Sequence, residues 1–180
     1  MWEGSFDLPI EDLEALFRTW VAEHGGIVMK VARAYTRSSE DCQDLAQEIL
    51  LQVWRSLPQF KGRASAATWS YRVALNTAIG WCRKERRRRI NHQPLFEMDE
   101  LPGAGADGSA DVGNCEIVDR LYAAIHELPK TDAALVLLYL DDMSYREMAE
   151  VLGISESNVG VKLNRAKKAL GELMKESHES

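Results

Sequence analysis

Hydrogen-bond donors and positive charges gather near the C-terminal end of the chain, in side chains suited to contact nucleic acid. They are Ser157, Asn158, Lys162, Arg165 and Lys168. Hydroxyl, amide and guanidinium groups can hydrogen-bond base edges in a major groove, and cations pair with phosphate oxygens. In a helix they lie opposite an apolar stripe of Val159, Leu163, Ala166 and Leu170. Val161 is interpreted as a passive surface residue, with contact to a thymine methyl as the alternative.

The residues before these donors carry the signals of a helix-turn-helix. Ser144 followed by Glu147 is a capping box, which predicts a helix beginning at Tyr145. Gly153 suits a helix end that needs positive φ, and Ser155 is placed to cap a second helix. The alternative is an amphipathic helical hairpin whose basic side is merely solvated.

Composition limits the class of protein. A chain of 180 residues with 46% hydrophobic content can form one ordinary domain or two small ones. Cys42, Cys82 and Cys115 lie far apart and lack metal-ligand spacing, so we expect reduced thiols and no metal site. The N-terminus has no basic segment followed by an apolar core, and the longest apolar run, 133–140, is too short for a bilayer. We therefore expect a cytoplasmic protein without membrane insertion.

The net charge of -6 conceals a segregated charge pattern. A basic cluster interrupted only by Glu85 comprises Arg83, Lys84, Arg86, Arg87, Arg88 and Arg89. By contrast, the segment from Glu97 to Asp119 contains acids and no Lys or Arg. Because local charge decides phosphate affinity, the basic cluster predicts a nucleic-acid contact. A solvated basic face is the alternative.

Acidic and amide side chains crowd the start of another predicted helix. Ser38 marks its N-terminus, and Asp41, Asp44, Gln47 and Glu48 occupy its first turns. Acids there also favour the positive end of the helix dipole, so a solvated first turn is one interpretation. A docking surface for a basic partner is the other.

An aromatic residue and two cations surround a glycine in the next loop. These residues are Phe60, Lys61, Gly62 and Arg63. An aromatic ring can stack on an unpaired base while cations hold the backbone, and glycine permits close approach. The loop therefore predicts contact with a single strand.

A long predicted helix follows this loop and runs into the basic cluster. Ser65 is its expected N-cap, and we place Trp69 in the core. Arg72 and Asn76 lie one turn apart and can contact base edges or phosphates, although a surface pair is the alternative.

Periodicity divides the chain into two units. Residues 10–92 form a first helical domain, in which the segments 12–24 and 27–37 are predicted as separate helices broken at Gly25 and Gly26. Residues 93–116 are an acidic, glycine-containing flexible linker, and 117–176 form a second domain that contains the helix-turn-helix. The expected fold class is all-α, with two small helical domains joined by that linker.

Laid out in this order, the motifs resemble those of bacterial sigma factors of the extracytoplasmic-function group in the sigma-70 family, over most of the chain. Asp41–Glu48 is similar to the family segment that grips the clamp helices of the polymerase's largest subunit. Phe60-Lys61-Gly62 and Thr68–Asn76 resemble the segment that opens the minus-ten element and captures a flipped base. Tyr145–Leu152 and Val159–Leu170 resemble the reader of the minus-thirty-five element.

The resemblance implies a promoter-specific initiation factor. Expected partners are core RNA polymerase, through its clamp and flap regions, and promoter DNA, with an anti-sigma protein as a further candidate. Polymerase binding falls to Asp41, Asp44, Gln47 and Glu48. Minus-ten binding falls to Phe60, Lys61, Arg63, Arg72, Asn76, Arg83, Lys84, Arg86 and Arg87. The donors Ser157, Asn158, Lys162, Arg165 and Lys168 are assigned to the minus-thirty-five element.

Three residues depart from the family pattern. Ala66 stands where the family often has an aromatic residue, Ser70 stands where an apolar residue is usual, and Gly160 occupies a recognition-helix position that is commonly basic.

Two other functions remain open from the sequence. A stand-alone helix-turn-helix regulator would bind duplex DNA tightly without polymerase, and the Asp41–Glu48 surface argues against it. A small helical hydrolase or transferase would need a metal or catalytic set. Glu97, Asp99 and Glu100 lie in predicted linker with no histidine at ligand spacing, so neither a cofactor nor an enzymatic activity is expected.

Overall fold

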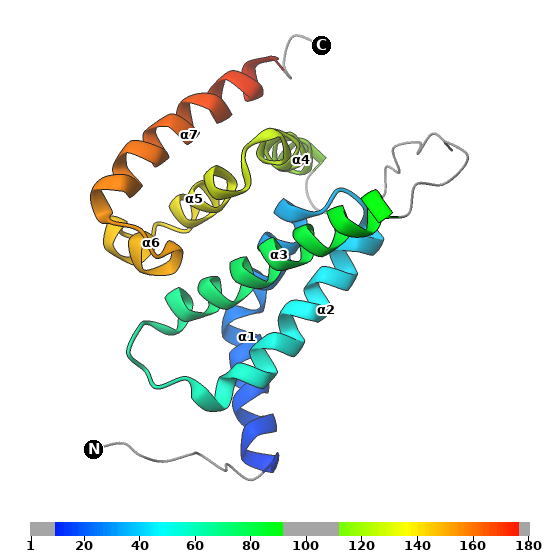
Figure 1. Cartoon of the computed structure of the whole chain (residues 1–180), viewed down its shortest axis with the longest axis vertical. Helices are drawn as coiled ribbons and strands as arrows, with labels where there is room; N and C mark the ends of the chain where they lie inside the picture. The colour runs from blue at the N-terminus through cyan, green and yellow to red at the C-terminus, as the bar shows by residue number, and fades with distance from the viewer. Residues whose placement is uncertain (1–9, 92–111, 177–180) are drawn as a thin grey trace.

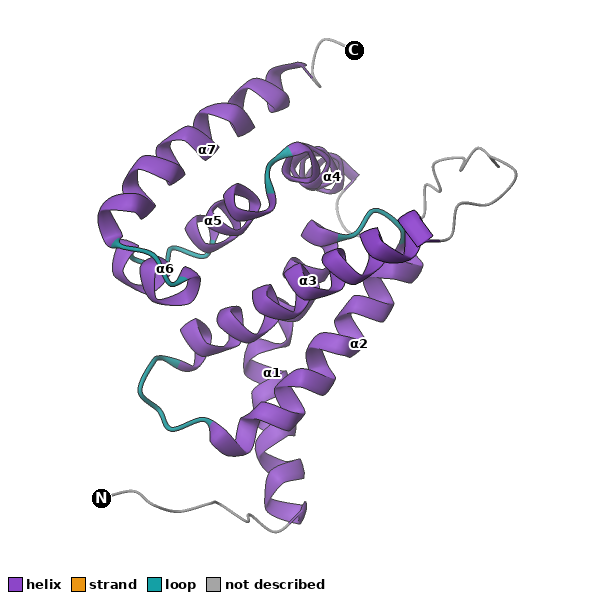
Figure 2. Ribbon diagram, viewed as in Figure 1, coloured by secondary structure: helices purple, strands orange, loops and turns teal. Residues whose placement is uncertain are grey.

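The computed structural model describes residues 10–91 and 112–176, which are helical throughout apart from short connections. Figures 1 and 2 show two groups of helices, α1 to α3 and α4 to α7, lying side by side. The helices are α1 (Ile10–Tyr35), α2 (Ser39–Ser56), α3 (Ala66–Asn91), α4 (Val112–Glu127), α5 (Lys130–Leu140), α6 (Tyr145–Leu152) and α7 (Glu156–Glu176), with a 3-10 turn η1 (Leu57–Gln59) after α2. No helix in these two ranges is long and apolar enough to cross a membrane.

The first domain is a three-helix bundle in which α1, α2 and α3 all pack against one another. Val31, Ile49 and Tyr71 contribute to its core and are almost completely buried. Ser38 accepts a hydrogen bond from the Asp41 backbone N–H and so begins α2 where the sequence predicts it. The all-α prediction is confirmed.

Helix α1 runs unbroken through Gly25 and Gly26, so the predicted division into two helices is wrong. Each glycine costs a helix interior about 0.5–1 kcal/mol relative to alanine. Packing offsets that cost, because Trp20 on one side of the pair and Ile27 and Val28 on the other are buried in the core.

Ser70 shows how this core accommodates a polar residue in place of an apolar one. Its hydroxyl is fully buried, accepts a hydrogen bond of 3.0 Å from the indole N–H of Trp20 and donates to the Ala66 carbonyl. Trp20 is itself buried, so its N–H needs a partner inside the protein. The serine therefore completes the packing of α3 on α1.

The second domain consists of α4 to α7, with α7 lying along α4, α5 and α6. Leu135, Leu138, Met148 and Leu163 are among its most deeply buried side chains. Helix α4 begins at Val112, inside the range 93–116 predicted as linker, so the end of that range is helical.

The two domains are in direct contact through α1 and α3 on one side and α4, α5 and α6 on the other. Asp141, the residue that ends α5, accepts a hydrogen bond of 2.6 Å from the Tyr71 hydroxyl and pairs with Lys30. The Tyr35 hydroxyl donates to the Lys130 carbonyl at 2.8 Å. We call this arrangement the closed state.

Candidate nucleic-acid interface

The turn between α6 and α7 has the geometry that its sequence predicts. The backbone N–H of Ser144 donates to Glu147 Oε2 at 2.9 Å, and the N–H of Glu147 donates to Ser144 Oγ at 3.3 Å. The Ser144 hydroxyl also donates to Glu147 Oε2 at 2.7 Å, and this bond, followed by the one from the Ser144 N–H, holds the pKa of Glu147 below its ordinary value. Gly153 has φ of 66°, and the Asn158 N–H donates to Ser155 Oγ, so both sides of the turn are fixed. The helix-turn-helix prediction is confirmed.

Helix α7 buries one face and presents the other to solvent. Val159, Leu163 and Ala166 are at most 1% exposed, whereas the predicted donors on the opposite face are accessible. The exposed donors are Ser157, Asn158, Arg165 and Lys168, while Lys162 is partly buried. The structure therefore brings these residues together on one helix.

Arg165 has a second partner inside the protein. Its guanidinium lies 3.6 Å from Asp132 in α5, whose side chain is only 7% exposed. A buried carboxylate needs a compensating charge, so Arg165 has a structural contact in addition to its predicted one with DNA. Spacing along the sequence does not indicate this pair, because Asp132 lies in another helix.

The aromatic residue of the loop before α3 is held against the bundle. The rings of Phe60 and Trp69 lie 5.0 Å apart, and the Thr68 N–H donates to Ser65 Oγ, which confirms Ser65 as the cap. Phe60 is only partly buried, so part of this residue is accessible to solvent. Lys61 and Arg63 beside it are exposed, and Gly62 has φ of 64°.

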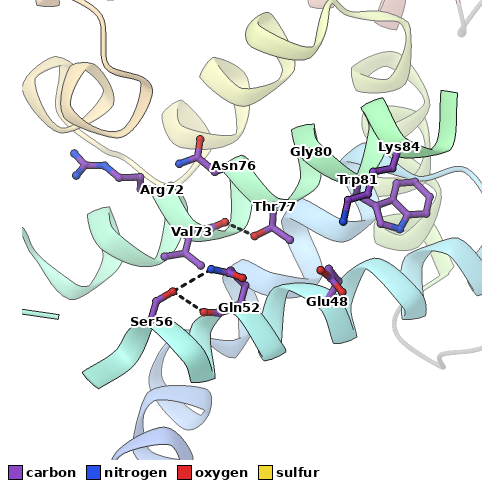
Figure 3. A pocket seen from close by; sticks show the side chains of 10 residues that line it. All are labelled: Glu48, Gln52, Ser56, Arg72, Val73, Asn76, Thr77, Gly80, Trp81 and Lys84. Carbon is purple, nitrogen blue, oxygen red and sulfur yellow. Dashed lines mark hydrogen bonds between the residues drawn. The ribbon is translucent and has the colours of Figure 1, made fainter. Parts of the chain in front are cut away.

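A groove of about 370 Å³ lies between α2 and α3. It is lined by polar side chains from both helices, among them Glu48 and Gln52 of α2 and Arg72, Asn76 and Lys84 of α3. Figure 3 shows Arg72 and Asn76 extending from α3 on the side away from α2. The structure therefore places the two residues side by side, as their spacing predicts.

In the closed state, Arg72 contacts the helix-turn-helix. Its guanidinium donates to the Glu150 carbonyl at 2.5 Å and lies 3.7 Å from the Glu150 carboxylate. That carbonyl belongs to the last turn of α6, where helix carbonyls lack intrahelical partners and carry partial negative charge. A predicted DNA-binding residue is thus in contact with the other domain, and no pattern in the sequence indicated this contact.

The basic cluster lies in the last turns of α3, where cations also favour the helix dipole. Its described members assigned to the minus-ten element, Arg83, Lys84, Arg86 and Arg87, are exposed. Arg88 forms an ion pair with Glu85 at 3.6 Å. The cluster lies on the same helix as Arg72, nearer the C-terminal end of α3.

The predicted polymerase-docking residues occupy one face of α2. Asp44 and Gln47 are exposed, and Asp41 and Glu48 are partly buried. Leu51 follows Asp44 by seven residues, or about two turns, on the same face and is 42% exposed. Leu51 was not among the predicted docking residues, although its helical spacing from Asp44 and Gln47 was a usable signal.

Cys82 is a poor candidate nucleophile. Burial raises the pKa of Cys82, which disfavours its thiolate. Residues 10–91 and 112–176 contain no cluster of side chains suited to a metal ion. The candidate acids Glu97, Asp99 and Glu100 lie outside the described residues.

Comparison with known proteins agrees with this geometry in both domains. The family Sigma-70 region 2 matches residues 20–88, and Sigma-70 region 4 matches residues 119–170. The ECF RNA polymerase sigma-E factor of Haemophilus influenzae is 29% identical over 150 residues, which cover 78% of this chain and 79% of the relative. RNA polymerase sigma factor SigV of Bacillus subtilis is 26% identical over 158 residues, covering 87% and 90%.

A solved structure supports the fold. The sigma factor RpoE of Bartonella quintana, crystallised with the anti-sigma factor NepR, superposes with a TM-score of 0.67 at 18% identity and covers 92% of this chain and 98% of that one. The two family matches together span more than half of the sequence, in the order that the motifs predict. The chain therefore belongs to the sigma-70 family, as a sigma factor of the extracytoplasmic-function group that directs RNA polymerase to promoters.

Proposed function

We propose that the second domain recognises the minus-thirty-five element through α7. The observation that carries this proposal is the capped helix-turn-helix, whose second helix presents hydroxyl, amide and cationic side chains opposite its buried face. A helix of this kind fits a major groove with its N-terminal residues against base edges. Ser157 and Asn158 are then the base-contacting candidates, and Lys168 is a phosphate contact. Arg165 contacts DNA while remaining close to Asp132.

The first domain is proposed to bind and open the minus-ten element. Extruding a base costs a few kcal/mol, so the protein must offer stacking and hydrogen bonds in return. Phe60, which is partly accessible, supplies an aromatic ring for stacking, and Lys61 and Arg63 lie beside it to hold the backbone. Arg72, Asn76 and the basic cluster continue this surface along α3, so a single strand following the helix meets donors throughout.

Docking to core polymerase is assigned to the exposed face of α2. Asp44 and Gln47 supply acceptors for a basic partner, and the exposed Leu51 beside them supplies apolar contact area. The expected partner is the clamp of the largest subunit, with the flap contacting the second domain. Tethering both domains to polymerase raises the effective concentration of each promoter contact, so neither domain needs high affinity alone.

Run-off transcription with core polymerase on a library of genomic promoters tests this function. The expected result is initiation at a restricted set of sites that share upstream and downstream elements. Asp44→Arg should weaken polymerase binding without unfolding the chain, since Asp44 is exposed. Asp12→Arg, an equal charge change on exposed α1 surface, is the matched control and should bind normally. Equal binding by both variants would remove the docking assignment.

Two further expectations follow from this role. It places the protein in the cytoplasm, together with the polymerase and the chromosome. A solved relative is bound to an anti-sigma factor, so we expect this chain also to be restrained by such a protein.

The role is that of an initiation factor, and polymerase carries out the chemistry. A stand-alone regulator is not favoured, because a protein that acts without polymerase would not need the region 2 domain that this chain contains.

A further inference from the structure

Val161 occupies the centre of the solvent-facing side of α7. Successive residues of an α-helix are 100° apart, so Val161 lies about 200° from Val159 on one side and from Leu163 on the other. Both of those residues are at most 1% exposed. Val161 therefore points almost directly away from the domain core, along the direction in which a bound major groove would lie.

Its exposure has no structural explanation within the domain. Val161 is 73% exposed, the highest value among the exposed large hydrophobic residues of the described ranges. A single exposed apolar side chain is common on protein surfaces. Valine is nevertheless no better a helix former than serine or asparagine and a poorer one than arginine or lysine, because its branched Cβ restricts χ1. Neither burial nor helix propensity accounts for a valine here.

The neighbours of Val161 on its own helix are all polar. At positions three and four residues away in each direction, they are Ser157, Asn158, Asn164 and Arg165. All four carry hydrogen-bonding groups, so Val161 is not part of an apolar stripe along α7. The adjacent Gly160 adds no side chain that would hold an approaching groove away from it. An apolar contact surrounded by donors fits a base-pair edge better than it fits a protein surface.

The major groove offers one apolar group to such a side chain. Base pairs present hydrogen-bond donors and acceptors there, and only thymine adds a methyl group, at C5. Cytosine presents an amino group and a C–H at the corresponding edge, so a valine gains little from it. The surrounding hydroxyl, amide and guanidinium groups can meanwhile satisfy the polar edges of the neighbouring base pairs.

We infer that Val161 is a specificity-determining residue that selects a thymine in the minus-thirty-five element by packing against its C5 methyl group. This inference rests on the proposed role of α7 in upstream recognition. It requires that the preferred upstream element contain a thymine, on either strand, at the position facing the centre of the helix. Because Val161 lies among the donors of α7, we no longer interpret it as a passive surface residue.

The test removes the methyl group and nothing else. Upstream duplexes taken from a promoter found by run-off transcription carry uracil in place of each thymine in turn, and fluorescence anisotropy measures their affinity for holoenzyme made from the full chain and core polymerase. At one position, uracil should weaken binding roughly fourfold, the change expected for losing one methyl-sized apolar contact. Val161→Ala should bind the thymine duplex more weakly, by a similar factor, and should bind the thymine and uracil duplexes equally.

Two control variants define the outcome. Lys168→Ala should weaken binding to both duplexes by the same factor and keep the fourfold preference, since a phosphate contact is blind to the methyl group. Val161→Thr, which keeps the shape of valine but replaces one methyl with a hydroxyl, should reduce the preference. If no thymine position is sensitive to uracil, or if Val161→Ala keeps the sensitivity, this inference is wrong while the proposed function stands. Failure of the holoenzyme to initiate at any promoter would instead refute the proposed function, and the inference with it.

Discussion

Removing the Tyr71 hydroxyl should loosen the contact between the two domains. Tyr71 is 1% exposed in the closed state, and its hydroxyl donates to Asp141 at 2.6 Å. Burial, and then this hydrogen bond, raise the pKa of Tyr71, so the phenol stays protonated and remains the donor. A hydrogen bond to a charged acceptor contributes about 1.5–3 kcal/mol. The Lys30 side chain, which pairs with Asp141, is 46% exposed, so this ion pair adds less, roughly 0.2–1 kcal/mol.

These values predict that Tyr71→Phe and Asp141→Ala shift the ratio of closed to open chains by about ten- to a hundredfold. The coupling energy of the double mutant should be about 1.5–3 kcal/mol, because either change alone removes the same bond. Single-molecule FRET between labels at the exposed positions Arg18 and Glu172 reports the distance between domains. Urea at concentrations below the unfolding transition should raise the population of the open state until it can be measured.

The control for this experiment is an ion pair with little expected energy. Arg37 and Glu127 form a contact of 2.8 Å between the domains, but their side chains are 71% and 56% exposed. Arg37→Gln should therefore change the closed fraction little. A coupling energy near zero between Tyr71 and Asp141, or an effect of Arg37→Gln as large as that of Tyr71→Phe, would refute the assignment of Asp141 as the main polar contact of the closed state.

The two domains must be able to separate, because the chain in the closed state cannot contact both proposed promoter elements at once. Elements named for positions ten and thirty-five lie roughly 25 base pairs apart, or about 85 Å along B-form DNA. A compact chain of this length has a radius of gyration of about 16 Å, and so measures about 40 Å across. The interface between the domains must therefore separate when both elements are bound, and variants that open it should bind promoter DNA more readily with polymerase.

Three other predictions concern stability. Ser70→Ala should lower the free energy of unfolding, measured by urea denaturation, by about 1–2 kcal/mol, because the buried indole N–H of Trp20 loses its acceptor. The higher helix propensity of alanine offsets only part of this loss, and an unchanged urea midpoint would contradict the hydrogen bond. Gly160→Ala should raise the melting temperature, by a stabilisation of about 0.5–1 kcal/mol, because the added Cβ has room and alanine favours the helix; a lower melting temperature would show strain there. Burial lowers the pKa of His126 below its ordinary 6.5, and its ring Nε2 lies 2.8 Å from the Arg33 carbonyl in the other domain. The contribution of His126 to the stability of the closed state is therefore present above pH 6.5 and should be lost as the pH falls below it. In FRET, His126→Gln should flatten this loss of closure at acid pH, and an equal acid response in both proteins would exclude His126 as its cause.

Local signals in the sequence predicted the elements well. Ser38, Ser65, Ser144 and Ser155 each accept a backbone hydrogen bond at the start of a helix, as predicted, because capping depends on residues only a few positions apart. The outward face of α7 was predictable for the same reason, since helical periodicity separates it from the buried face.

Long-range packing explains what the sequence did not reveal. Gly25 and Gly26 indicated a break by local propensity, but the burial of Ile27 and Val28 keeps α1 continuous. The hydrogen bond from Trp20 to Ser70 joins residues 50 positions apart, so no spacing rule could have found it. The contacts of Arg72 with Glu150, and of Arg165 with Asp132, likewise join helices that are distant in sequence. Propensity and periodicity describe single elements, and they contain no information about such pairs.

The contact between Arg72 of α3 and the last turn of α6 affects how promoter binding depends on ionic strength. A cation that pairs with phosphate releases a condensed counterion, and each such contact steepens the fall of affinity with added salt. In the closed chain, Glu150 already neutralises the Arg72 guanidinium, and added salt weakens that pairing too. Salt therefore frees Arg72 while it screens the phosphates, and the measured slope should be shallower than the number of phosphate contacts alone would give.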